Sequence, residues 1–381
     1  MKIAVDCRYI CSRPSGIGAY VRALVDRIPA LAPDFRFLFW RHPEAPGGTL
    51  STARNVTEHA SFSTPNEPIS WFLPSLFGPT DTDVFHSPHN LLGHGIGNLS
   101  AAVTTIHDLM WVTSPELCDD VSWRRSIRAP FFQAGILHAI RHSTLLLTVS
   151  QASADALVRY DKSLQNRVFV THNAADPWFR PTNDPGLART NAARIIGSNA
   201  SFFLLVGQNS PYKGHALAIS AFAQAAGPDD RLVLVQRLFS GGELEALAQK
   251  LGVRDRIIVL PGVSREDLVT LLHATRALLQ PSLAEGFGMP ALEAMASGCP
   301  VITSDIPPLV EVLGGAGLHF ASGFARDLAH AIRQLNDSPT LADELRHRGL
   351  ERAKAFSWDN TAEITVDVYR EAAKLGPRRP G

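Results

Sequence analysis

The chain has 381 residues, of which 45% are hydrophobic and 19% charged, and 36 basic side chains balance 36 acidic ones to a formal net charge of zero. This composition is globular, the lack of a basic excess argues against general nucleic-acid binding, and the length predicts two domains. The four cysteines are scattered, and the sequence shows no apolar leader and no apolar run long enough to span a bilayer. We therefore expect a cytoplasmic protein, at most one that sits at the inner face of the membrane.

Short β-branched or apolar runs alternate with amphipathic stretches along most of the chain. Such alternation predicts an α/β fold in which helices cover parallel sheets. The expected strands are 3–5, 35–40, 84–86, 102–106, 145–149 and 168–171, then 202–206, 231–236, 257–260, 277–280 and 300–304. The expected helices include 18–28, 150–160, 214–226, 242–251 and 265–274.

A segment rich in proline, asparagine and aspartate, 176–186, has no hydrophobic periodicity and is expected to link two domains. Residues 1–180 then form an N-terminal Rossmann-like domain, and residues 186–358 form a second one. The last amphipathic stretch, 359–375, is typical of one more helix.

Two glycines follow the first strand, in the run Ser15-Gly-Ile-Gly-Ala-Tyr20. Gly16 and Gly18 allow a sharp turn and a close approach to a ligand, and the start of the helix that follows can receive an anion. A tight strand-to-helix connection explains the same residues equally well, because a single Gly-x-Gly is a weak motif.

Several histidines lie near the ends of expected strands. One strand ends in His107-Asp108, at the edge where open α/β sheets bind ligands. A histidine there can donate hydrogen bonds and exchange protons, or it can simply cap the loop. His86, His89 and His94 follow another strand, but no carboxylate or cysteine has matching metal-ligand spacing, so we expect no metal site.

The most informative stretch is Glu285-Gly-Phe-Gly-Met-Pro-Ala-Leu-Glu293, just after an expected strand. Gly286 and Gly288 predict a loop with exposed backbone N–H groups, and Pro290 suits the first position of a short helix. That helix would direct its positive end at a diphosphate. Glu285 and Glu293 could accept hydrogen bonds from two parts of one sugar nucleotide, with a purely structural role as the alternative for each.

The same residues also match a dinucleotide fingerprint, Gly286-Phe-Gly-Met-Pro-Ala291, with Asp305 near the acidic position of such sites. This alternative predicts an NAD-dependent oxidoreductase. Against it, five residues separate the expected strand from the first glycine, whereas the fingerprint places its glycines directly at the strand–helix turn.

Lys213 lies just past another expected strand, 202–206. It is either a point charge for a phosphate or an ordinary surface lysine.

Together these motifs resemble glycosyltransferase family 4, which has the GT-B fold of two Rossmann-like domains with parallel sheets facing across a cleft. The resemblance covers nearly the full chain and includes bacterial mannosyltransferases of polysaccharide biosynthesis. The matching segments are 16–18, 105–108, 148–153, 172–176, 206–214, 255–264 and 285–293, the last of which carries the family's E-x7-E motif.

The resemblance implies roles for the residues of this last motif. Glu293 would hold the ribose hydroxyls of the donor. Glu285, with the backbone of Phe287, Gly288 and Met289, would orient the donor sugar.

It implies roles for residues elsewhere in the chain as well. Lys213 would neutralise the diphosphate together with Gly16 and Gly18, and His107 would contact the donor sugar and the reacting region. The family is retaining and needs no metal or other cofactor, since the leaving diphosphate itself takes the acceptor proton. The family's arginine before the lysine is missing here, and Arg237 is the candidate substitute.

The resemblance also implies the two substrates. The donor would be a nucleotide sugar, with GDP-mannose favoured over UDP-sugars, and the acceptor a saccharide, lipid-linked in many bacterial members. A basic and aromatic stretch, 122–132, would suit an anionic membrane surface or form an ordinary amphipathic helix. The helix at 359–381 would complete the N-terminal domain. A non-catalytic module that binds sugar nucleotides remains a further alternative.

Overall fold

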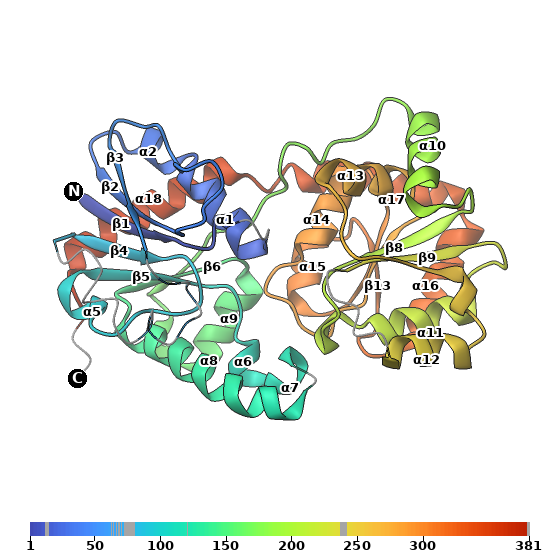
Figure 1. Ribbon diagram of the computed structural model, residues 1–381, viewed down its shortest axis with the longest axis horizontal. Helices are drawn as coiled ribbons and strands as arrows, with labels where there is room; N and C mark the ends of the chain where they lie inside the picture. Colours follow the sequence, from blue (N-terminus) through green and yellow to red (C-terminus); the bar gives the residue numbers. More distant parts are fainter. Residues whose placement is uncertain are drawn as a thin grey trace. The chain divides into compact units, whose positions relative to one another are not determined.

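The computed structural model describes residues 1–11, 15–61, 63, 65, 67, 69, 71, 81–119, 121–236 and 242–378. The chain divides into two compact units. The first contains Met1–Pro115, Ser122–Asn173 and Ser357–Gly381, and the second contains Glu116–Val121 and Ala174–Phe356. Each unit is built around its own parallel sheet with helices on both faces (Figure 1).

The sheet of the first unit has the order β3-β2-β1-β4-β5-β6-β7 among the described strands. These strands are β1 (Lys2–Cys7), β2 (Arg36–Arg41), β3 (Val56–Ala60), β4 (Val84–Ser87), β5 (Ala101–Ile106), β6 (Leu145–Thr148) and β7 (Val168–Val170). The central strands β4, β5 and β6 are buried at every residue, as parallel strands covered on both faces must be.

Helices of the first unit cover both faces of this sheet. Its helical segments are α1 (Gly16–Val25), α2 (Ile28–Leu31), α5 (Ile96–Leu99), α6 (Met110–Thr113), α8 (Ser122–His142), α9 (Gln151–Tyr160), η1 (Lys162–Leu164) and α18 (Trp358–Leu375). The short helix α7 (Pro115–Cys118) has its first residue in the first unit and the others in the second. In Figure 1, α1, α2 and α18 cover one face, and α8 and α9 cover the other.

The C-terminal helix α18 packs on the first unit although it is last in the sequence. It begins at the N-cap Ser357, and its buried face carries Tyr369. The Tyr369 hydroxyl lies 2.7 Å from His86 Nδ1, and His86 Nε2 lies 2.9 Å from the hydroxyl of Thr105 on β5. Burial lowers the pKa of His86 to about 3. His86 is therefore a neutral bridge between the helix and the sheet.

The sheet of the second unit has the order β10-β9-β8-β11-β12-β13. Its strands are β8 (Phe202–Val206), β9 (Arg231–Val235), β10 (Ile257–Leu260), β11 (Leu278–Gln280), β12 (Val301–Ser304) and β13 (Leu318–Phe320). Its helical segments are α10 (Pro185–Ile196), η2 (Pro211–Lys213), α11 (His215–Ala225), α12 (Gly242–Lys250), η3 (Arg254–Arg256), α13 (Arg265–Ala274), α14 (Met289–Ala296), α15 (Pro307–Leu313), α16 (Ala325–Asp337) and α17 (Pro339–Ala353). Helices α11, α12 and α16 pack together on one face, and α10, α13, α14 and α17 lie on the other (Figure 1).

The predicted α/β fold of two parallel sheets is confirmed, and each expected strand is present within two residues at either end. Two strands were missed, β3 and β13, and both lie at sheet edges. Edge strands carry a weaker pattern: β3 is only half buried and contains polar residues, and β13 has three residues. The expected linker also ends early, because Pro185 begins α10 with Asp184 as its N-cap.

Candidate functional site

The loop between β11 and α14 is shaped by a glycine. Gly288 has a φ of +114°, a left-handed conformation, and a Cβ at this position would lie 2.4 Å from Leu309 Cδ2. Only glycine satisfies both conditions without a shift of the neighbours. Helix α14 then begins at Met289. Pro290 is therefore its second residue, one position later than the sequence predicted. Proline is accepted there because the first helical N–H groups have no partner within the helix.

Glu285 is fixed in this loop by three donors. Its Oε1 accepts from Lys213 Nζ at 2.7 Å, from the Gln280 side-chain amide at 2.9 Å and from the Ser282 hydroxyl at 2.7 Å. The lysine and glutamate side chains are only 14% and 9% exposed, so the ion pair is largely shielded from solvent. Among the described residues Oε2 has no hydrogen-bond partner, which leaves it able to accept from a ligand hydroxyl.

The turn η2 carries Lys213 to this carboxylate through a close backbone contact. Gly214 has a φ of +68°, and a Cβ there would lie 2.1 Å from the carbonyl oxygen of Pro281. Beside it, the Leu283 N–H donates to the Tyr212 carbonyl at 2.7 Å. The loops after two neighbouring strands, β8 and β11, therefore touch directly and hold the lysine beside the glutamate. Their pairing was not predicted from the sequence.

Gln280 and Ser282 are the site residues that the sequence reasoning missed. Gln280 is the last residue of β11, and Ser282 precedes Glu285 by three positions. The available signal was their place at the carboxyl end of a strand, where α/β sheets collect polar ligand-binding groups.

Glu293 lies one turn inside α14 and is half buried. Its burial raises the pKa of the carboxyl to about 8, with Arg265 opposing the shift and Asp176 adding to it. Within the described part of the chain, no hydrogen bond reaches this carboxyl. Glu293 is therefore mostly protonated at neutral pH when no ligand is bound.

This pKa predicts how Glu293 contributes to stability. Between pH 4.5 and 8 the folded chain keeps a proton that the unfolded chain has lost, so stability falls as the pH rises across this window. We expect Glu293→Gln to remove this loss, so that its melting temperature rises relative to the wild type from pH 5 to pH 9. Differential scanning fluorimetry at several pH values would measure the two melting temperatures. Glu266→Gln, at an exposed residue of α13, should show no such trend. If the melting temperatures of Glu293→Gln and the wild type differ by the same amount at every pH, the raised pKa of Glu293 is contradicted.

His107, at the end of β5, is held by its own loop. Its Nε2 lies 3.0 Å from the Pro88 carbonyl and so donates to it, and its backbone N–H donates to the Asn90 side chain at 2.7 Å. Burial lowers the pKa of the ring to about 4, so it is neutral at physiological pH. These bonds fit the alternative in which His107 caps its loop, and a contact of His107 with the donor sugar stays a prediction. Its Nδ1 can only accept a hydrogen bond.

Gly16 and Gly18 lie in the first turn of α1 and not in a loop before it, because Ser15 caps the helix through the Gly18 N–H at 3.0 Å. A Cβ on Gly18 would lie 2.7 Å from the Tyr9 carbonyl oxygen, whereas Gly16 faces open space. Gly18 is thus required by local packing. A phosphate-binding role of either glycine stays a prediction.

Three other predicted residues need comment. The Phe287 side chain is buried and meets the Phe356 ring edge-on at 5.6 Å, so only its backbone could reach a ligand. Met289, as the first residue of α14, has a backbone N–H without a partner inside the helix. Arg237 lies outside the described residues.

No group of three or more His, Cys, Asp or Glu side chains suited to a metal ion occurs in the described ranges. His86 bonds to Tyr369 and Thr105, His89 contacts Asp6, and His94 packs at a tilt against the rings of Trp71 and His138. These three histidines therefore do not converge.

Helix α8 contains the predicted basic and aromatic stretch. Trp123 and Ile127 are exposed, but Arg128 lies over the rings of Trp111 and Phe132, so part of the stretch packs on itself. Across the described residues, no helix has both the length and the apolar character to cross a bilayer.

Comparison with known proteins supports a transferase. Residues 190–355 match the family model described as Glycosyl transferases group 1. The O-antigen chain mannosyltransferase B of Escherichia coli is 30% identical over 293 residues, which cover 75% of this chain and 74% of that protein. The D-inositol 3-phosphate glycosyltransferase 1 of Catenulispora acidiphila is 30% identical over 357 residues, which cover 85% and 83%.

Solved structures show the same fold. A sucrose-phosphate synthase from Thermosynechococcus elongatus matches with a TM-score of 0.73 at 19% identity, over 97% of this chain and 98% of that one. WaaG, a glycosyltransferase involved in lipopolysaccharide biosynthesis, matches with a TM-score of 0.72 at 17% identity, over 96% of this chain and 99% of that one.

The oxidoreductase alternative is not favoured, since β11 ends at Gln280 and the fingerprint glycines do not lie at the turn that follows it. The chain belongs to the group 1 glycosyltransferases, as its resemblance to family 4 predicted.

Proposed function

We propose that this glycosyltransferase moves a hexose, with mannose favoured, from a nucleoside-diphosphate sugar to a saccharide acceptor, with retention of anomeric configuration and without a metal ion. The observation that carries the proposal is the ion pair of Lys213 and Glu285 beside the start of α14. A lysine ammonium is a point charge for phosphate, and a carboxylate accepts from sugar hydroxyls. The pair matches the two chemical halves of a sugar diphosphate.

Each residue would act on a different part of the donor. The N-terminus of α14, with the Met289 N–H and the positive end of the helix dipole, would receive the diphosphate beside Lys213. Glu285 Oε2 would accept from the hexose, since Oε1 is already fixed by its three donors. Glu293 would accept from the ribose hydroxyls once it has lost its proton.

In the transfer step, the bond from the anomeric carbon to the diphosphate oxygen breaks, and the acceptor oxygen bonds to the same carbon on the same face. The acceptor proton passes to the leaving diphosphate. Lys213 would stabilise the charge that develops on this leaving group. The neutral His107 would serve only as a hydrogen-bond acceptor toward the donor sugar.

The favoured donor is GDP-mannose and the favoured acceptor a lipid-linked saccharide of the bacterial cell surface. The relative named as an O-antigen chain mannosyltransferase supports mannose as the transferred sugar and a saccharide chain as the acceptor. The exposed Trp123 and Ile127 of α8, with the arginines of that helix, would offer a peripheral contact with an anionic membrane.

A thermal-shift panel of UDP, GDP, ADP and NAD, followed by transfer assays with labelled donors, tests this proposal. We expect GDP to raise the melting temperature most, because it is the nucleotide of the favoured donor. NAD should leave the melting temperature unchanged, because its diphosphate is not terminal. Transfer from GDP-mannose should continue in EDTA and give the α-linked product by NMR. Stabilisation by NAD alone, or an inverted product, would contradict the proposal.

A further inference from the structure

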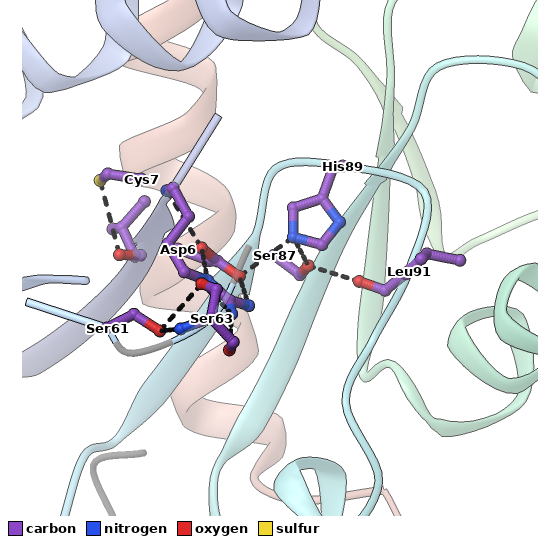
Figure 2. Close-up of polar contacts among 9 residues, drawn as sticks. Asp6, Cys7, Ser61, Ser63, Ser87, His89 and Leu91 are labelled. Atoms are coloured by element: carbon purple, nitrogen blue, oxygen red, sulfur yellow. Dashed lines mark hydrogen bonds and ion pairs between the residues drawn. The ribbon is translucent and has the colours of Figure 1, made fainter. Parts of the chain in front are cut away.

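The first unit has a pocket that the proposed function does not use. It opens at the carboxyl ends of β1, β2 and β4 and is lined by residues that include Asp6, Arg8, Trp40, Ser87 and His89. Its volume is about 10 Å³, which is room for one water-sized group such as a hydroxyl. Figure 2 shows Asp6 from β1 and His89 from the loop after β4 meeting beside Ser87.

Asp6 is the centre of a buried network. Arg8 donates to both of its oxygens, at 2.8 and 2.6 Å, and His89 Nε2 lies 3.0 Å from Oδ2. Burial alone would raise the pKa of the Asp6 carboxyl, but the positive charge of Arg8 and the hydrogen bonds from Arg8 and His89 outweigh it and hold this pKa well below its usual range. Asp6 is therefore ionised, and Arg8 balances its charge.

This network determines which nitrogen of His89 carries the proton. The ionised Asp6 can only accept, so Nε2 must donate to it. The Ser87 hydroxyl is 3.3 Å from the same nitrogen and donates its own proton to the Leu91 carbonyl at 2.5 Å, so it too can only accept from His89. With the ring proton on Nε2, Nδ1 is a hydrogen-bond acceptor.

Among the described residues, His89 Nδ1 is buried and has no hydrogen-bond partner, and the same holds for the indole N–H of Trp40. Both side chains are less than 5% exposed. A buried polar atom without a partner typically costs about 1–3 kcal/mol, so such atoms in a pocket indicate a group that is bound in the functional state. His89 Nδ1 needs a hydrogen-bond donor, and the Trp40 N–H needs an acceptor. A hydroxyl group is both.

We propose that this pocket binds a hydroxyl group of the saccharide acceptor, which donates to His89 Nδ1. This assignment rests on the proposed function. The charges favour a neutral group over a phosphate, because Asp6 and Arg8 neutralise each other inside the pocket. Asp6 acts as the positioning residue, since its bond to Nε2 fixes the ring so that Nδ1 stays the acceptor.

The first experiment observes His89 directly in the full-length protein labelled with [15N]histidine. NMR should show His89 with its proton on Nε2, and titration with methyl α-D-mannopyranoside or methyl β-D-glucopyranoside should shift its Nδ1 resonance. A proton on Nδ1 overturns the proposal. So does an Nδ1 resonance that neither glycoside shifts, because the pocket then holds water only. This experiment uses the wild-type protein, so it tests the pocket assignment even if the variants described next fail to fold.

The second experiment compares His89→Gln with His59→Gln, which changes an exposed histidine of β3 in the same unit. Glutamine can still donate to Asp6, but its one side-chain acceptor is a carbonyl oxygen that does not take the position of the ring Nδ1. We expect His89→Gln to raise the acceptor KM about tenfold, the effect of roughly one hydrogen bond, and to change kcat less than threefold. His59→Gln should match the wild type. The stabilisation by GDP should be the same in all three proteins.

The outcomes separate this inference from the proposed function. If the wild type transfers hexose and His89→Gln keeps the wild-type acceptor KM, the pocket assignment is wrong and the proposed function stands. If the wild type binds no nucleoside diphosphate and transfers nothing, the proposed function is wrong, and the histidine NMR titration still tests whether the pocket binds a saccharide.

Discussion

Lys213→Met is expected to lower kcat for hexosyl transfer by roughly 10²–10³-fold, the loss typical when one group that stabilises transition-state charge is removed. Methionine keeps the length of the side chain but removes the charge that would meet the leaving diphosphate. Steady-state kinetics with GDP-mannose would measure the loss. Lys250→Met, at an exposed lysine of α12, is the matched control and should be fully active.

Loss of the lysine also leaves Glu285 without its counter-ion, and this effect must be separated from catalysis. The glutamate is only 9% exposed, so we expect Lys213→Met to lower the free energy of unfolding by roughly 2–3 kcal/mol. The double variant Lys213→Met/Glu285→Gln removes both charges and should recover most of this stability while staying inactive. Recovery of activity along with stability would show that Lys213 is structural and has no role at the phosphate.

Gly214→Ala is expected to lower the free energy of unfolding by more than about 2 kcal/mol, since the left-handed conformation alone costs a non-glycine residue about 1–2 kcal/mol. In addition, the new Cβ would lie 2.1 Å from the Pro281 carbonyl oxygen, a contact that only a backbone shift relieves. That shift would move the loop that carries Glu285, so transfer activity should fall as well. Urea denaturation and steady-state kinetics would measure the two effects.

Gly197→Ala is the matched control for this variant. Gly197 has the same φ of +68°, but its Cβ would meet no atom within 4 Å. The control should therefore show the conformational cost alone and keep its activity. Equal destabilisation in the two variants would mean that the contact between the loops after β8 and β11 does not matter.

The sequence by itself determined the fold class and the positions of most strands. Strands such as β5 and β8 are continuous apolar runs because parallel sheets are buried on both faces, and this pattern is local. The loop before α14 was likewise visible, since Gly288 and Pro290 are local constraints on the backbone. The edge strands β3 and β13 escaped detection because half-exposed or very short strands lack that pattern.

The tertiary structure decided which polar groups meet and in what state of protonation. Lys213 and Glu285 are 72 residues apart, and Asp6 and His89 are 83 apart, so their pairing depends on how neighbouring strands align their carboxyl ends. The neutral state of His107 and the protonated state of Glu293 depend on burial, which no sequence spacing specifies. Local patterns specify backbone conformation, whereas the chemistry of a side chain is set by neighbours that only the folded chain brings to it.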